Sequence, residues 1–138
     1  MYSLLICGSR IATPQMLELA RRVVQRASEL GWTILVGDAA GIDAEVICAC
    51  ESLKLPAKCF GISPQPRATI IDTQLVQYIQ VQVPHSRRAY LQRDEIMVRQ
   101  ADRLYAIWNG TSGGTIYTYK YALSQRKPAH LWDATGRR

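Results

Sequence analysis

Short apolar runs alternate with longer amphipathic segments along the whole 138-residue chain, and this alternation is the strongest constraint on its fold. The apolar runs resemble strands that are buried on both faces of a sheet. The segments between them have the length and the apolar spacing of helices. Strands that alternate with helices form parallel sheets. We therefore predict one α/β domain over residues 1–138, with three layers, a mostly parallel sheet and helices on both of its faces.

The elements can be placed from caps, turns and periodicity. The expected strands are 3–7, 32–36, 57–62, 77–83, 104–108 and 128–132. The expected helices run from Pro14 to Gly31, from about 43 to 53, from a cap at Ser86 to about 101, and over 116–125. Residues 77–83 alternate between apolar and polar side chains, which is typical of a strand near a sheet edge. Residues 68–75 fit either a short strand or a helical turn.

Glycine-containing turns follow three of the expected strands. Their sequences are GSR at 8–10, GDAAGID at 37–43 and NGTSGGT at 109–115. In open parallel sheets, ligands bind outside the carboxyl ends of the strands, and these ends share one edge. We therefore expect the three turns to meet at a common site.

The turn at 109–115 is the clearest candidate for an anion site. A helix that begins here would present unpaired backbone N–H groups and the positive end of its dipole. Gly113 and Gly114 would let an anion approach the backbone closely, because neither has a Cβ atom. Ser112 and Thr115 would add hydroxyl donors. The alternative is an ordinary strand-to-helix turn in which Thr115 is only the helix cap.

Composition limits the partners without selecting one. The net charge of +6 favours an anionic partner, which could be a nucleotide, a nucleic acid or an acidic protein. No apolar run reaches the roughly 18 residues of a membrane span, and the start has no basic leader. We expect a cytoplasmic protein without a membrane partner. The four cysteines form no C-x-x-C pair, which predicts buried free thiols rather than a zinc site.

Several common catalytic motifs are missing. The chain has no G-x-G-x-x-G dinucleotide fingerprint, no P-loop and no G-x-S-x-G elbow. No cluster of histidines and carboxylates suggests a metal. The sequence therefore predicts neither a metal nor a tightly held cofactor, assigns no catalytic residue, and favours a binding cradle over a catalytic site.

Four motifs in order resemble one superfamily. The motifs are GSR at 8–10, GDAAGID at 37–43, RDEIMVRQAD at 93–102 and WNGTSGGT at 108–115. Together they resemble the SLOG superfamily, which includes the recombination mediator DprA, the LOG phosphoribohydrolases and small stand-alone YspA/YpsA-like domains. The match covers nearly the whole chain and looks closest to the stand-alone type. It implies a Rossmann-like fold that binds nucleotides or their derivatives, such as ADP-ribose-like ligands.

The resemblance and the anion-site argument together predict a set of ligand-binding residues. These residues are Gly8, Ser9, Arg10, Gly37, Asp38, Gly41, Asp43, Arg93, Ser112, Gly113, Gly114 and Thr115. Asp38 replaces a family glycine, and could hydrogen-bond a ribose hydroxyl or cap the following helix. Asp43 could equally be a first-turn acid that interacts with the helix dipole. Arg93 could instead be a surface arginine paired with Asp94 or Glu95.

One departure from the family bears on chemistry. LOG enzymes carry a glutamate shortly after the G-T pair, and Tyr117 and Thr118 occupy those positions here. Cleavage of an N-glycosidic bond needs a carboxylate to stabilise developing positive charge. We therefore predict nucleotide binding or sensing. The alternatives are a LOG-like phosphoribohydrolase and DprA-like single-strand DNA binding. Nucleic acid is a less favoured partner than a nucleotide, because the Lys and Arg residues are scattered along the sequence.

The tyrosines of the last expected helix suggest self-association. Tyr117, Tyr119 and Tyr121 cannot all lie on one helical face, because successive residues turn by about 100°. An exposed aromatic patch usually has a partner. We therefore expect a homodimer or a larger homo-oligomer.

Overall fold

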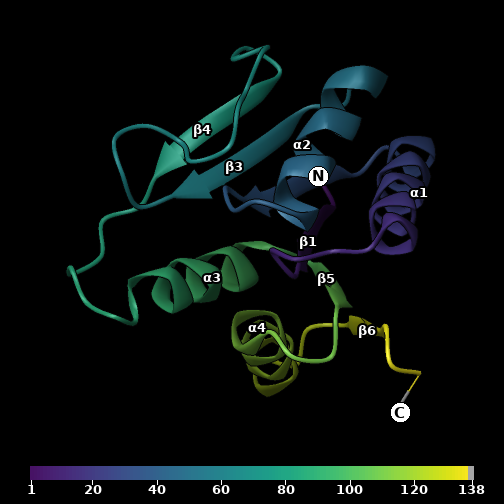
Figure 1. Cartoon of the computed structure of the whole chain (residues 1–138). Helices are drawn as coiled ribbons and strands as arrows, with labels where there is room; N and C mark the ends of the chain where they lie inside the picture. The colour runs from purple at the N-terminus through teal and green to yellow at the C-terminus, as the bar shows by residue number, and fades with distance from the viewer. Residues whose placement is uncertain (137–138) are drawn as a thin grey trace.

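Six parallel strands form one sheet in the computed structural model, which describes residues 1–136 (Figure 1). The strand order is β4-β3-β2-β1-β5-β6. The strands are β1 Ser3–Gly8, β2 Thr33–Gly37, β3 Ala57–Gly61, β4 Val76–Gln80, β5 Arg103–Trp108 and β6 Ala129–Asp133. The helices are α1 Pro14–Leu30, α2 Ile42–Leu53, α3 Ala89–Gln100 and α4 Gly113–Ser124. The predicted α/β class is confirmed, and the sheet is parallel throughout rather than mostly parallel.

Two hydrophobic cores separate the helices into layers. Leu4 and Ile6 of β1 belong to the core that α1 and α2 cover. Leu5 and Cys7, the alternate residues of the same strand, belong to the core that α3 and α4 cover. Figure 1 shows the two helix pairs on opposite sides of the sheet. This arrangement confirms the predicted three layers, because both faces of the central strands are apolar and each face needs a helical cover.

The order of the strands reverses between β1 and β5. The chain adds β2, β3 and β4 on one side of β1, and then returns to add β5 and β6 on the other. Such a switch point leaves a crevice at the carboxyl ends of the two strands, because their following loops lead to opposite faces. The loop after β1 is tied to both neighbours: the Ser9 N–H donates to the Ile107 carbonyl at 3.1 Å, and the Ile42 N–H donates to the Ser9 carbonyl at 3.2 Å. The predicted convergence of the three turns is confirmed.

The helix ends test the cap predictions. For α1 they are confirmed, because the Thr13 hydroxyl accepts the Met16 N–H at 3.2 Å and Gly31 ends the helix with φ at 71°. For α3 the predicted cap is wrong: the Ser86 hydroxyl accepts the Arg88 N–H within a turn, and the helix begins later, at Ala89. For α4 the predicted start at residue 116 is too late. The helix already begins at Gly113, so Thr115 lies inside its first turn.

Residues 68–75 form neither of the two predicted structures. They make bends and turns that are pinned by side chains. The Glu51 carboxylate accepts the N–H groups of Ile71 and Asp72, and the Asp72 carboxylate accepts those of Gln74 and Leu75. Polar side chains here satisfy backbone donors that a strand or helix would otherwise pair. The strand that follows, β4, is shorter than predicted and lies at the sheet edge, as predicted.

Three side-chain predictions have mixed outcomes. Cys7, Cys50 and Cys59 are buried and free, whereas Cys48 is exposed, so its predicted burial is wrong. The α4 tyrosines are half-buried, and Tyr117 and Tyr121 hydrogen-bond side chains of α3. They form no exposed aromatic patch, so homo-oligomerisation stays a prediction without support from this helix.

Within residues 1–136, no helix combines the length and the apolar character that crossing a bilayer requires.

Candidate ligand-binding cleft

A cleft of about 580 Å³ opens at the carboxyl ends of β1 and β5. It is bounded by the loop after β1, the start of α4, and the first half of α3. Most of the predicted ligand-binding residues line it: Gly8, Ser9, Arg10, Asp43, Arg93, Ser112, Gly113, Gly114 and Thr115. The fold therefore brings together side chains that lie more than 100 residues apart in sequence, because the switch point places their turns side by side.

Asn109 holds the turn after β5 in shape. Its side-chain oxygen accepts the N–H groups of Thr111 and Ser112 at 2.9 and 3.0 Å. Its side-chain nitrogen donates to the Ile11 carbonyl at 3.1 Å, and its backbone N–H donates to the Ser9 hydroxyl at 2.9 Å. Asn109 thus joins the two turns that form one wall of the cleft. Its role had no separate signal in the sequence beyond its position in the turn.

The start of α4 has the properties expected of an anion site. Its first-turn N–H groups have no partners within the helix, and the positive end of the helix dipole lies there. Gly113 and Gly114 are exposed, and a Cβ atom built on either would meet no other atom within 4 Å. The two glycines therefore leave the surface of the first turn of α4 uncovered by other parts of the protein.

Gly37, Asp38 and Gly41 do not line the cleft but support it from behind. A Cβ atom on Gly37 would lie 2.7 Å from the Asp43 carboxylate and 2.8 Å from the Arg93 guanidinium, so only glycine leaves these two groups room. Gly41 has φ at 75° and packs against the backbone of the loop after β1. Both glycines serve close packing between the turns.

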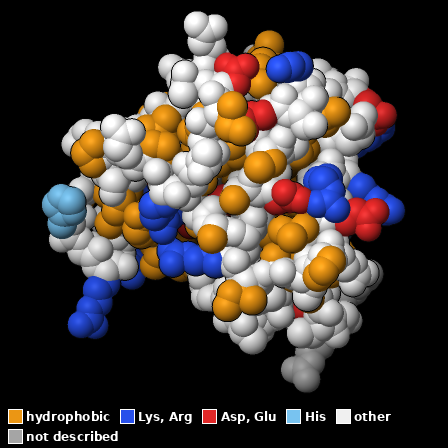
Figure 2. All heavy atoms as spheres, turned by 45° about the horizontal axis from the view of Figure 1, so that its top comes forward, with side chains coloured by type: hydrophobic (Ala, Val, Ile, Leu, Met, Phe, Trp, Pro, Cys, Tyr) orange, Lys and Arg blue, Asp and Glu red, His pale blue; other side chains and the backbone are white. Residues whose placement is uncertain are grey.

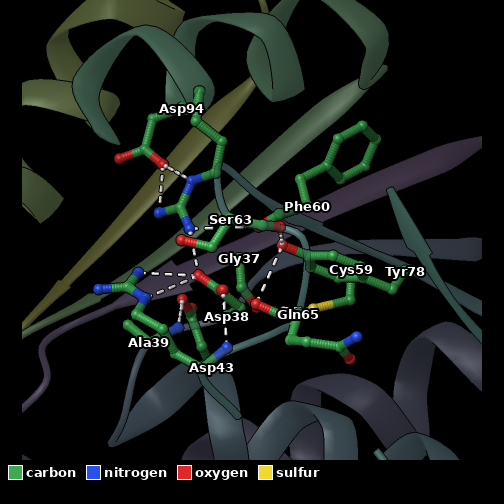
Figure 3. A network of polar contacts seen from close by, with 12 residues as sticks. Gly37, Asp38, Ala39, Asp43, Cys59, Phe60, Ser63, Gln65, Tyr78 and Asp94 are labelled. Atoms are coloured by element: carbon green, nitrogen blue, oxygen red, sulfur yellow. Dashed lines mark hydrogen bonds and ion pairs between the residues drawn. The ribbon is translucent and has the colours of Figure 1, made fainter. Parts of the chain in front are cut away.

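Asp38 is the centre of a buried charge network (Figure 3). It is fully buried, and its carboxylate accepts hydrogen bonds from Arg93 at 2.9 Å and from the side chain and backbone of Arg67 at 2.8 to 3.0 Å. The helix-cap alternative for Asp38 is wrong, because α2 has no side-chain cap. These contacts hold Asp38 away from the cleft surface and fix two arginines, of which Arg93 lines the cleft and Arg67 does not.

Arg93 is buried and doubly paired. Its guanidinium donates to Asp38, to the Phe60 carbonyl at 3.2 Å, and twice to one oxygen of Asp94, at 2.9 and 2.7 Å. The sequence analysis offered, as an alternative, a surface Arg93 paired with Asp94 or Glu95. The pairing with Asp94 is present, but the surface location is wrong, because Arg93 is only 5% exposed. The planar, five-donor guanidinium is suited to joining two carboxylates in this way.

Asp43 lies at the floor of the cleft and forms no salt bridge of its own among residues 1–136. One carboxylate oxygen accepts the Ala39 N–H at 3.1 Å. Burial raises the pKa of Asp43 to about 7, although the nearby Arg93 lowers it in part. Burial also raises the pKa of Asp94 and of the Cys7 thiol, which line the same cleft. Perturbed pKa values gathered in one cleft are characteristic of functional sites.

The sequence reasoning missed several residues of the cleft, chiefly Tyr90, Asp94 and Thr118. The Tyr90 ring lies under the guanidinium of Arg67 at 3.8 Å and near that of Arg93 at 5.2 Å. Thr118 donates to the free oxygen of Asp94 at 3.0 Å. The cleft therefore contains a carboxylate beside the position at which LOG enzymes carry theirs, supplied by α3 instead of α4. Asp94 and Thr118 are 24 residues apart in the sequence, and no motif in the sequence indicated that they are in contact.

The fold and the cleft define a Rossmann-like α/β domain with a ligand site at the topological switch point. Residues 2–136 match the family model of DNA recombination-mediator protein A. The chain therefore belongs to the DNA recombination-mediator protein A family, within the SLOG superfamily that the motifs indicated. Among curated proteins, no sequence match to the chain was found.

Solved structures with the same fold include two kinds of binding protein. The molybdenum cofactor binding protein of Rippkaea orientalis is 20% identical, with a TM-score of 0.78, over 96% of this chain and 76% of that one. The Chlamydomonas reinhardtii Moco carrier protein is 18% identical, with a TM-score of 0.72, over 94% and 75%. Helicobacter pylori DNA processing protein A, described with a single-stranded DNA binding mode, is 17% identical, with a TM-score of 0.69, over 94% and 64%. At these identities the likeness establishes the fold alone.

Proposed function

We propose that the domain binds a nucleotide or nucleotide derivative, of ADP-ribose-like type, with a phosphate group at the N-terminus of α4. The observation that carries this proposal is the open backbone at Gly113 and Gly114, at the end of a cleft about 580 Å³ in volume. A volume of that order lies within the range typical of small-molecule sites. Arg10 and Arg87 also line the cleft and add positive charge near its rim.

The fold relatives support an anionic ligand. Two of them are described as binding or carrying the molybdenum cofactor, and another as binding single-stranded DNA. Anion binding at a helix N-terminus next to a glycine-rich turn follows from backbone geometry and the helix dipole alone. A compact ligand fits this cleft better than a polymer does, because the free N–H groups of one helix hold only one or two phosphates.

Replacing Gly114 by valine is expected to abolish nucleotide binding without unfolding the protein. The added side chain meets no protein atom within 4 Å of its Cβ, so it projects into open space where the phosphate would lie. Isothermal titration with AMP, ADP and ADP-ribose measures the loss, and thermal melting monitors the fold. Ser124→Val, at the opposite end of α4, is the matched control and should bind as the wild type does. Wild-type affinity in Gly114→Val would place the ligand elsewhere.

Phosphoribohydrolase activity is a second candidate, favoured by the Asp94 carboxylate beside Thr118. Under the binding proposal, however, both oxygens of Asp94 are already engaged, by Arg93 and Thr118, and serve to fix the wall of the cleft. We expect no adenine release when the protein is incubated with AMP, as measured by chromatography. Turnover on the order of 1 per second, ordinary for an enzyme, would establish the hydrolase, and its loss in Asp94→Asn would identify the carboxylate.

Binding of single-stranded DNA is expected to be weak at physiological salt. On the face shown in Figure 2, Lys and Arg side chains lie in small groups, interspersed with carboxylates, rather than in one stripe. A polymer binder contacts many phosphates, so its log affinity falls by about 0.7 per contacted phosphate for each tenfold rise in salt. Fluorescence titration of a labelled oligonucleotide at two salt concentrations measures this slope. Submicromolar affinity that collapses at the higher concentration would favour the DNA-binding alternative.

A further inference from the structure

Three hydroxyl groups run in a line from the interior to the N-terminus of α4. The Ser9 and Ser112 oxygens are 2.7 Å apart, and the Ser112 and Thr115 oxygens are 3.2 Å apart. Ser9 is fully buried and Thr115 is 5% exposed. At its inner end the line receives the Asn109 N–H, which donates to the Ser9 oxygen at 2.9 Å.

The direction of this line follows from counting hydrogens. Each hydroxyl has one hydrogen to donate. Geometry assigns Ser112 as the donor to Thr115, so the hydrogen of Ser112 is already used. Ser9 must therefore be the donor in its contact with Ser112, and it can be, because the Asn109 N–H fills its acceptor side. Every hydrogen bond in the line points outward, from Asn109 through Ser9 and Ser112 to Thr115.

The line ends on a donor for which the described part of the chain offers no acceptor. The Thr115 oxygen accepts from Ser112, and among residues 1–136 no acceptor receives the hydrogen of Thr115. The Thr118 hydroxyl, one turn later, can give its single hydrogen to the Gly114 carbonyl or to Asp94, whereas Thr115 has no such contact within residues 1–136. Thr115 lines the cleft, beside the free backbone of Gly113 and Gly114. A buried donor without an acceptor is costly unless a ligand supplies one.

We propose that Ser9, through Ser112, orients the Thr115 hydroxyl as a hydrogen-bond donor to an oxyanion of the ligand, and that Ser9 itself does not touch the ligand. This inference rests on the proposed function and names the group that the site selects. The donors at the start of α4 are neutral, and they favour a group that offers lone pairs and no hydrogen. A fully ionised phosphoryl group meets that requirement. Ser9 is thus a positioning residue, whereas the sequence motif suggested a ligand contact.

A double-mutant cycle with inorganic phosphate at pH 8 tests this relay. Phosphate is titrated while the backbone amide signals of Gly113 and Gly114 are followed by NMR. Thr115→Val removes the terminal donor at nearly constant shape and should weaken phosphate binding roughly tenfold to a hundredfold, as expected for a hydrogen bond to a charged group. Thr115→Ser should restore most of the affinity. Ser9→Ala should weaken binding roughly threefold to tenfold, because Thr115 keeps its hydroxyl and loses its orientation.

The decisive measurement is Ser9→Ala in the Thr115→Val background. There it should change phosphate affinity by less than about twofold, because Ser9 acts only by orienting the Thr115 hydroxyl, which is absent in that background. Ser112→Ala interrupts the line with Ser9 intact, and should reproduce the same pattern even where Ser9→Ala fails to fold. Ser124→Ala removes a hydroxyl at the far end of α4 and should bind phosphate as the wild type does.

The possible failures are distinguishable. Losses from Ser9→Ala and Thr115→Val that multiply in the double variant would overturn the relay while leaving the anion site in place. Unperturbed Gly113 and Gly114 signals at saturating phosphate would overturn both the relay and the placement of the phosphate. A parallel titration with AMP then decides whether the domain binds nucleotides at all, which is the proposed function itself.

Discussion

Replacing Asp38 by alanine is expected to lower the free energy of unfolding by about 3 to 5 kcal/mol, the cost of leaving a buried charge without its partner. Asp38 is fully buried and is the shared acceptor of two arginines. Its removal leaves Arg93, 5% exposed, with Asp94 as its one remaining salt-bridge partner among residues 1–136. Urea unfolding followed by circular dichroism measures the change, and the same variant should lose ordered structure around Arg67.

Two further variants separate charge from packing. Glu18→Ala breaks an exposed pair with Arg22 and should cost less than about 1 kcal/mol, as surface ion pairs do. Arg67→Ala leaves the more deeply buried pair of Asp38 and Arg93 in place and should cost less than Asp38→Ala. A loss below about 1 kcal/mol in Asp38→Ala would show that water replaces the carboxylate, and that the network does not hold the wall of the cleft.

The central part of the fold could be predicted because its signals are local and strong. An apolar run such as residues 3–7 can be buried on both faces of a sheet only if helices cover it. Thr13, Pro14 and Gly31 are cap residues whose preferences arise within a single turn of helix. The convergence of the three glycine-containing turns also followed, since the carboxyl ends of parallel strands meet at one edge.

The predictions failed where side chains replace backbone pairing. Residues 68–75 carry no regular structure because Glu51, on a different element, satisfies their N–H groups. A contact across 20 residues leaves no periodicity in the sequence. Ser86 looked like a helix cap, yet its hydroxyl closes a separate turn with Arg88, and α3 begins only at Ala89. Local propensity cannot distinguish a cap from a turn when both use the same hydrogen bond.

The candidate site shows the same division. Glycine-rich turns predicted where the cleft lies and part of its lining, because turns that follow parallel strands meet at one edge of the sheet. Asp38 was predicted to face a ligand, and the partner that turns it inward, Arg67, lies in a proline-rich loop 29 residues away. Asp94 and Thr118 meet across two helices, a contact that depends on how α3 and α4 pack. Pairings of this kind arise from tertiary structure alone.

Asp43 gives the cleft a built-in dependence of stability on pH. Its pKa rises from 3.8 to about 7 in the folded protein, mainly because burial disfavours the charged form. The folded state therefore holds this proton more tightly than the unfolded chain does. Its contribution to stability is fully present below pH 3.8 and is lost as the pH rises through 7. A shift of about 3 units corresponds to roughly 4 kcal/mol at alkaline pH.

Replacing Asp43 by asparagine is therefore expected to stabilise the protein at pH 8, by up to about 4 kcal/mol, and to change its stability little near pH 4. The asparagine oxygen still accepts the Ala39 N–H, so the variant imitates the neutral acid. Urea unfolding of variant and wild type at pH 4, 6 and 8 measures the difference, which should grow with pH. Glu29→Gln, an exposed carboxyl beside Arg26, is the control and should show no such trend. A variant that is less stable than the wild type at pH 8 would mean that the Asp43 carboxylate is held ionised by Arg93, and that the floor of the cleft is negatively charged at neutral pH.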